Sequence, residues 1–194
     1  MDGTEKRTMT PAGERVLRAA SEMFYREGIR AVGVEAIAAE AGVTKKTLYE
    51  RFGSKDGLIV AYLRARDERW RSWMEESVEG SGGSPKERLL STFDALEGWI
   101  ERENPRGCGF VNAAAENPDP SHPARKLAIE QKKWLREYFE KLSEEAGAEE
   151  PGDLAERLVI LHEGATVAHS LEAATDTARK AKQIAAILIA DLPE

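Results

Sequence analysis

The chain has 194 residues, 41% of them hydrophobic, and its formal net charge at pH 7 is −7. This length and apolar content suffice for one medium domain, or a small and a medium one, with packed cores, which excludes a disordered chain. Its single cysteine excludes an intramolecular disulfide and argues against a thiolate zinc cluster.

No part of the sequence has the pattern of a membrane segment. The longest uncharged apolar runs fall far short of the roughly 18 to 20 residues that span a bilayer. Residues 1–10, MDGTEKRTMT, contain no apolar signal core. We therefore expect a cytoplasmic protein with no membrane partner.

The first predicted helix follows Thr10 and Pro11, which are typical of an N-cap and a first helical residue. Apolar side chains then recur at helical spacing until Gly28 ends the helix. They are Val16, Leu17, Ala20 and Phe24. The pattern predicts one amphipathic helix.

Residues 28–58 have the pattern of a helix-turn-helix. A first short helix would carry three apolar side chains inward: Val34, Ile37 and Ala38. Gly42, in the AlaGlyVal step that follows, can adopt left-handed backbone angles at little cost. Thr44 can then cap a second helix over residues 45–51.

The second helix of this motif separates an apolar face from a basic one. Leu48 and Phe52 are four residues apart, so we expect both to face the core. The other side chains remain for solvent or a partner: Lys45, Lys46, Thr47, Tyr49 and Arg51. Such a set suits the phosphates and base edges of nucleic acid. The alternative is a three-helix domain whose basic face is merely solvated.

Two longer helices are predicted next. Ser54 caps the first, which ends near the glycine- and serine-rich loop at residues 80–84. Ser84 and Glu87 form a capping box around Pro85 and open the second.

The rest of the chain continues in helices. We expect them at about residues 110–116, 127–142, 154–173 and 175–192. Residues 117–123 predict an irregular connection, and Gly147 and Pro151 are expected to break the chain. Because no segment alternates with the period of a strand, the predicted fold class is all-α.

The helix-turn-helix run resembles the N-terminal signature of the TetR family of one-component bacterial transcription regulators. The matching positions, without a gap, are Gly28, Ile37, Ala38, Ala41, Gly42, Val43, Thr44, Thr47, Leu48, Tyr49, Phe52, Ser54, Lys55 and Leu58. The resemblance implies a helix-turn-helix DNA-binding domain at residues 1–54 and a ligand-binding and dimerisation domain at residues 55–194. Residues 1–55 hold ten Lys or Arg against eight Asp or Glu, so the remainder is strongly acidic, which fits a DNA-facing head on an acidic body.

The resemblance also implies residue roles on double-stranded operator DNA. The recognition helix would enter the major groove with four residues: Thr44, Lys45, Lys46 and Thr47. Tyr49, Arg51 and Lys55 would hold backbone phosphates. Where the family commonly has Ser or Thr at the first short helix, this chain has Gly33, so a contact there would use backbone amides.

In the family, the last two helices pack against those of a second copy, which implies a homodimer that reads a palindrome. The expected interface residues are Leu158, Leu161, Ala165, Ala168, Ala181, Ile184 and Leu188. The alternative is that the two helices pack only within one chain.

Aromatic and polar side chains of the body suggest a ligand pocket between helices. The candidate lining residues are Trp70, Trp73, Phe93, Trp99, Phe110, Trp134, Tyr138, His162, Thr166 and His169. Plain core packing is the alternative for each aromatic residue. The two histidines of the late helix are seven residues apart, but exposed or hydrogen-bonded histidines are the default, so we expect no metal and no cofactor.

Catalytic motifs are absent from the sequence: it has no glycine-rich phosphate loop, no GxSxG and no HExxH. Cys108 is a redox trigger only if it is exposed and activated, and an inert thiol is the alternative. We therefore interpret the chain not as an enzyme but as a homodimeric repressor, which a small, largely apolar ligand releases from a palindromic operator. A helical interaction module without specific DNA binding, or more remotely a small-molecule enzyme, is the alternative.

Overall fold

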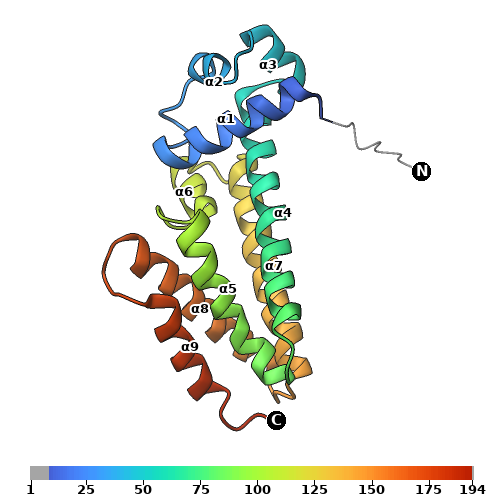
Figure 1. The fold of residues 1–194 in the computed structure, drawn as a ribbon, viewed down its shortest axis with the longest axis vertical. Coiled ribbons are helices and arrows are strands. Elements are labelled where there is room, and N and C mark those ends of the chain that lie inside the picture. Colours follow the sequence, from blue (N-terminus) through green and yellow to red (C-terminus); the bar gives the residue numbers. More distant parts are fainter. Residues whose placement is uncertain (1–8, 194) are drawn as a thin grey trace, which may run out of the picture.

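The computed structural model describes residues 9–193, and this part of the chain is helical and has no strand (Figure 1). Its helices are α1 (Pro11–Glu27), α2 (Val34–Glu40), α3 (Lys45–Phe52), α4 (Lys55–Ser81), α5 (Pro85–Glu103), α6 (Gly109–Glu116), α7 (Pro123–Glu145), α8 (Pro151–Ser170) and α9 (Thr177–Leu188). The all-α prediction is confirmed. Residues 1–8, part of the segment expected to lack a signal core, lie outside the described residues. Within residues 9–193, no helix combines the length and apolar character needed to cross a membrane.

The first three helices form a head at one end of the molecule (Figure 1). As predicted, Thr10 caps α1, and its Oγ1 accepts a hydrogen bond from the amide three residues later at 3.3 Å. Gly42 has a φ of 62°, so glycine relieves the strain that a side chain would cause in the turn between α2 and α3. Arg15 of α1 donates from Nε to the carbonyl oxygen of Ala41 at 3.1 Å and so holds this turn against α1.

Helix α4 joins the head to the body. Ser54 caps it, with Oγ accepting from an amide of the first turn at 3.0 Å. Leu58 and Leu63, near its start, are fully buried in the core of the head. Met74 and Val78, three to four turns further on, are buried in the core of the body. Helix α4 therefore contributes side chains to the cores of both the head and the body.

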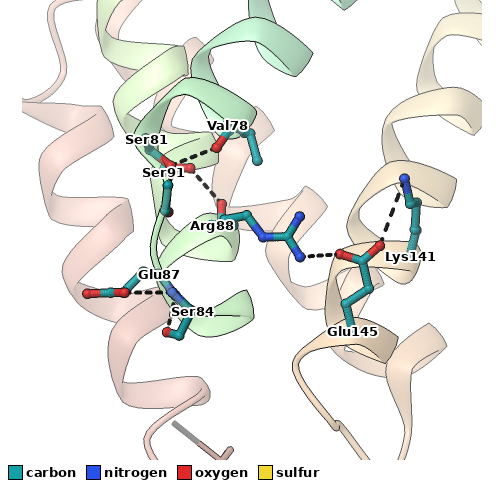
Figure 2. Close-up of polar contacts among 9 residues, drawn as sticks. Val78, Ser81, Ser84, Glu87, Arg88, Ser91, Lys141 and Glu145 are labelled. Carbon is teal, nitrogen blue, oxygen red and sulfur yellow. Dashed lines mark hydrogen bonds and ion pairs between the residues drawn. The ribbon is translucent and has the colours of Figure 1, made fainter.

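The predicted capping box opens α5 (Figure 2). Ser84 Oγ accepts from the amide of Glu87 at 3.3 Å, and Glu87 Oε2 accepts from the amide of Ser84 at 2.8 Å. One turn later, Arg88 pairs with Glu145 near the end of α7, with 2.5 Å between Nη2 and Oε2. The first turn of α5 is thus held by its own cap and by an ion pair to a neighbouring helix.

The last two helices differ from the prediction at their ends. Pro151 was expected to break the chain, but it lies in the first turn of α8, where a missing amide proton costs nothing. Glu172 and Asp176 have φ values of 53° and 52°, and these left-handed residues interrupt the helix between Ser170 and Thr177. Helix α9 then lies alongside α5 and α8 (Figure 1).

Candidate DNA-binding surface and body cavity

Helix α3 lies at the outer end of the head (Figure 1), and it carries the basic residues that the sequence analysis singled out. Leu48 is fully buried and Phe52 packs partly buried against the same core, as the spacing predicted. Lys45, Lys46 and Arg51 are exposed. Tyr49 exposes 43% of its surface, which is a large fraction for an aromatic residue. The two faces of α3 are therefore separated as expected.

The start of α3 carries two hydroxyl groups beside its first amides. Thr44 Oγ1 accepts from the amide of Thr47 at 3.1 Å, and the two threonine hydroxyls are 3.0 Å apart. The first amides of a helix have no carbonyl partner within it and carry partial positive charge. This end of α3 therefore suits an anionic group such as a phosphate.

Lys45 pairs with a residue that the sequence analysis did not single out. Its Nζ is 2.8 Å from Oε1 of Glu35, in the first turn of α2, and both side chains are more than half exposed. The hydrogen bond between them raises the pKa of Lys45 and lowers the pKa of Glu35. Lys46 lies 3.9 Å from Glu50 on its own helix. The pairing of Lys45 depends on how α2 and α3 pack, so no local pattern indicates it.

Two further candidate contacts lie at other helix starts. Gly33 is the N-cap of α2, is exposed and makes no side-chain cap, so backbone amides are what it can offer to a phosphate. Lys55 is the first residue of α4 and is partly exposed.

A cavity of about 30 Å³ lies in the body between α4, α5, α6, α7 and α8. Five of the predicted pocket residues line it: Trp70, Trp99, Phe110, His162 and Thr166. The other five do not: Trp73, Phe93, Trp134, Tyr138 and His169. A cavity of this size holds about one water molecule, so a larger ligand must displace side chains that line it.

The predicted residues outside the cavity have other packing roles. Phe93 is buried in the core, with its ring centroid 6.3 Å from that of His162. Trp73 donates from Nε1 to a backbone carbonyl of α5 at 2.7 Å. Trp134 and Tyr138 stack on each other with ring centroids 5.2 Å apart. His169 is partly exposed near the end of α8, whereas His162 is buried, so the pair does not form one site.

Charged residues also line the cavity, and one of them, Lys132, was not selected by the sequence analysis. Lys132 Nζ is 2.6 Å from Oε1 of Glu163 and 3.4 Å from Sγ of Cys108. Burial acts to raise the pKa of Glu163, but His162 and Lys132 outweigh it and lower that pKa to about 2. Burial opposes the charge of Lys132, yet Cys108 and Glu163 raise its pKa. The cavity therefore contains a stable ion pair.

Arg66 is the other charged residue of the lining, and it is only 4% exposed. Its Nη2 donates to the carbonyl oxygen of Glu103 at 2.9 Å and to Oδ1 of Asn104 at 2.8 Å. Its guanidinium also lies 4.4 Å from the centroid of the Tyr25 ring. Among residues 9–193, no carboxylate forms an ion pair with it.

The expected dimer residues divide into two groups. Leu158, Ala165 and Ala181 are buried in the core of their own chain, which leaves them little surface to offer a second copy. Ile184 and Leu188 are 47% and 40% exposed, and Leu161 and Ala168 are partly exposed. Four other exposed apolar side chains were missed. They are Ile160 and Val167 of α8, Leu171 just after α8, and Ile187 of α9. The periodicity identified an apolar stripe correctly but not which of two stripes faces inward.

Two family models match the chain. Residues 16–62 match the model of bacterial regulatory proteins of the tetR family, and residues 85–185 match the model of the tetracyclin repressor-like C-terminal domain. The HTH-type transcriptional regulator YjdC of Escherichia coli is 23% identical over 151 residues, which are 78% of this chain and 79% of that protein. The HTH-type transcriptional activator FasR of Mycolicibacterium smegmatis is 31% identical over 53% of this chain and 48% of its own.

Solved structures resemble the whole chain. A TetR-family transcriptional regulator from Streptomyces coelicolor superposes with a TM-score of 0.86 and 32% identity, covering 95% of this chain and 97% of that one. A putative regulator of the same kind from Streptomyces avermitilis has a TM-score of 0.73 and 32% identity, covering 91% and 98%. The similarity therefore includes both head and body.

Proposed function

The chain belongs to the TetR family of bacterial regulatory proteins, and from this premise we propose that it is a homodimeric repressor that a small effector releases from a palindromic operator. As a family member it is a DNA-binding transcriptional regulator and not an enzyme. The observation that carries the proposal is the exposed basic start of α3 at the outer end of the head. Repression is part of the proposal, since one relative is named an activator.

On the operator, α3 enters the major groove and reads base edges with Lys45, Lys46 and Thr47. Tyr49, Arg51 and Lys55 hold phosphates and set the orientation of the head, with the Thr44 hydroxyl and the Gly33 backbone beside them. Lys45, Lys46, Tyr49 and Arg51 are exposed, and Thr47 and Lys55 are partly exposed, which supports the assignment. Lys45 must leave Glu35 to reach DNA, so Lys46 is the lysine with more freedom to read a base.

Two copies associate through α8 and α9. The exposed apolar side chains of these helices and of the residues just after α8 support this, since large exposed apolar surfaces are rare in monomers. A single recognition helix makes few base contacts, whereas two heads separated by helical turns of DNA read a palindrome. Dimerisation is therefore part of the DNA-binding function.

The effector occupies the body cavity and is largely apolar where it contacts Trp70, Trp99 and Phe110. His162 and Thr166 offer it polar atoms. The cavity is too small for such a molecule without displacement of its walls. Arg66 and Trp70 belong to α4, so entry of the effector tilts α4 and changes the spacing of the two heads. By linkage, the effector and the operator weaken each other's binding by the same factor.

The test is a binding titration of the purified protein with the DNA immediately upstream of its own gene. It is made with scrambled competitor at about 50 and about 200 mM salt. We expect competitor-resistant binding as a dimer that weakens by about a thousandfold or more between these salt concentrations, because some six to ten phosphate contacts release counterions.

Weak, competitor-sensitive binding to that fragment leads to a selection from genomic DNA. Failure of both experiments contradicts the repressor assignment. It favours the alternative in which the chain is an interaction module without specific DNA binding.

A further inference from the structure

The cavity contains a buried cation without a matching anion. Lys132 and Glu163 neutralise each other at 2.6 Å, whereas Arg66 has only a backbone carbonyl and an amide oxygen as hydrogen-bond acceptors within the described chain. A buried charge is expensive unless an opposite charge accompanies it. The lining therefore carries one net positive charge, which a monoanion would balance.

The start of α6 borders the same cavity. Gly109 and Phe110, the first two residues of α6, both line the cavity. Cys108 is the N-cap but its side chain forms no cap hydrogen bond, and the first amides of a helix have no carbonyl partner within it. A helix start of this kind favours an anion.

Arg66 and α6 are in close contact. A Cβ atom placed on Gly109 would lie 2.9 Å from Nε of Arg66 and 3.1 Å from the Tyr62 hydroxyl. Glycine at this position thus lets the start of α6 pack directly against the guanidinium of Arg66. The arrangement matches the two oxygens of a carboxylate, which accept from several converging donors.

Independent evidence for a ligand comes from buried polar atoms without partners. His162 is 3% exposed, and neither of its ring nitrogens has a hydrogen bond within residues 9–193, the nearest carboxylate oxygen being 3.7 Å away. Trp70 Nε1 and Gln131 Oε1 are likewise buried without a partner in that part of the chain. All three residues line the cavity. Such groups are costly unless a water or a ligand satisfies them.

The walls of the cavity are aromatic. The rings of Trp70 and Trp99 meet edge to face with centroids 5.2 Å apart, and Phe110 lines the same space. A planar ring can pack against these surfaces. We propose that the effector is a small aromatic carboxylic acid whose carboxylate binds between Arg66 and the start of α6. This inference rests on the proposed function for the location of the effector and adds its chemical class.

The site is linked to the head by α6 itself. Glu116, the last residue of α6, accepts through Oε2 from the amide of Arg30 in the loop between α1 and α2 at 2.8 Å. Tyr25 of α1 donates through its hydroxyl to the carbonyl of Gly107, just before α6, at 3.1 Å. An anion that draws the start of α6 toward Arg66 therefore pulls on two contacts with the head, in addition to displacing α4.

The inference is tested on the whole protein without DNA. Benzoate and 2-naphthoate are compared with their neutral amides, benzamide and 2-naphthamide, and with acetate. Binding is followed by calorimetry and by tryptophan fluorescence, to which Trp70 and Trp99 report. We expect at least one carboxylate to bind at least about tenfold more tightly than its amide and than acetate, since hydrogen bonds to charged groups are the stronger ones.

Arg66→Gln should remove this tenfold preference and leave the binding of the amide unchanged. Arg64→Gln, an exposed arginine on the same helix, is the matched control and should behave as the native protein. If circular dichroism shows that Arg66→Gln does not fold, Gly109→Ala replaces it, because the added methyl group would occupy the space beside Nε of Arg66.

Equal binding of acid and amide would overturn the inference, as would an unchanged preference in a folded Arg66→Gln protein. The absence of carboxylate binding up to roughly 10 mM would also overturn it. Release of operator DNA is measured separately. If the acid binds but does not release operator DNA, the carboxylate site is supported and effector-controlled repression is contradicted. A failure of the site and a failure of the proposed function are therefore distinguishable.

Discussion

His162 is enclosed by aromatic rings, with its centroid 5.7 Å from that of Trp70 and 6.0 Å from that of Phe139. Burial lowers the pKa of His162, although the nearby Glu163 acts in the opposite direction. The folded protein thus binds fewer protons at this residue than the unfolded chain, whose histidine titrates near its ordinary pKa of about 6.5. Stability therefore rises with pH through this range and is lost as pH falls below about 6.5.

The measurement is urea unfolding at about pH 7.5 and about pH 5.5. We expect the native protein to be less stable at the lower pH and the His162→Gln protein to lose part of that difference. His169→Gln, in the last turn of the same helix, is the control and should retain it. Glu163 has a pKa near 2 in the folded protein, so its contribution to stability begins to be lost only when the pH falls below about 4.5. An unchanged pH dependence in His162→Gln would contradict the assignment.

The head residues divide by the kind of DNA contact that we propose for them. Lys46→Ala should alter which base is preferred at one operator position, with a cost of about 1 to 3 kcal/mol for the favoured base. Lys55→Ala should weaken binding to all sequences alike and reduce the salt slope by about 1. Tyr49→Phe should also weaken binding to all operator sequences alike.

Selection from a randomised operator library measures both effects. Lys133→Ala removes an exposed lysine of α7, where it lies 3.5 Å from Glu137, and should change neither affinity nor preference. An unaltered base preference in Lys46→Ala would remove that residue from base reading.

Helices begin and end largely where local chemistry predicts. Thr10, Thr44, Ser54 and Ser84 all accept a hydrogen bond from an amide in the first turn of the helix that follows. These bonds involve residues three positions apart, so a local reading of the sequence finds them. Pro151 was misjudged because a proline both stops a helix and suits its first turn, and only the packing of α8 against α7 distinguishes the two.

The capping box of α5 provides a test at this scale (Figure 2). Ser84→Ala removes the hydroxyl that accepts from the amide of Glu87 and should reduce the free energy of unfolding by about 1 kcal/mol. Ser81→Ala, at the last residue of α4, removes a hydroxyl that donates to the carbonyl of Val78. It should change the free energy of unfolding by less than about 0.5 kcal/mol. Both are measured by urea unfolding at one fixed protein concentration, because association shifts apparent stability. Equal losses would show that the cap contributes nothing specific.

Association is a property of the whole molecule. Ile187 exposes 75% of its surface on α9, and the proposed interface would cover it. Ile187→Lys places a charge in that apolar contact, so dimerisation should weaken by more than about tenfold. Sedimentation velocity over a range of concentrations measures this. Glu76→Lys, an exposed charge change on α4, is the control and should leave the dimer intact. A dimer that survives Ile187→Lys would place the interface elsewhere.

The cavity shows where sequence reasoning reaches its limit. Five of ten predicted residues line it, because aromatic side chains on amphipathic helices are common in both cores and pockets. Arg66 and Lys132 were not selected, since charged residues on helices are usually solvated. Their burial depends on helices that are distant along the chain.

The sequence by itself determined the helical class, the order of the elements, most of the caps and the helix-turn-helix. These features depend on residues within a few positions of one another, and periodicity and capping record them directly. Only the tertiary structure decided which apolar stripe of α8 is buried and that Arg66 meets the start of α6 beside His162. These outcomes depend on how helices pack against one another, and packing brings together residues that no local pattern relates.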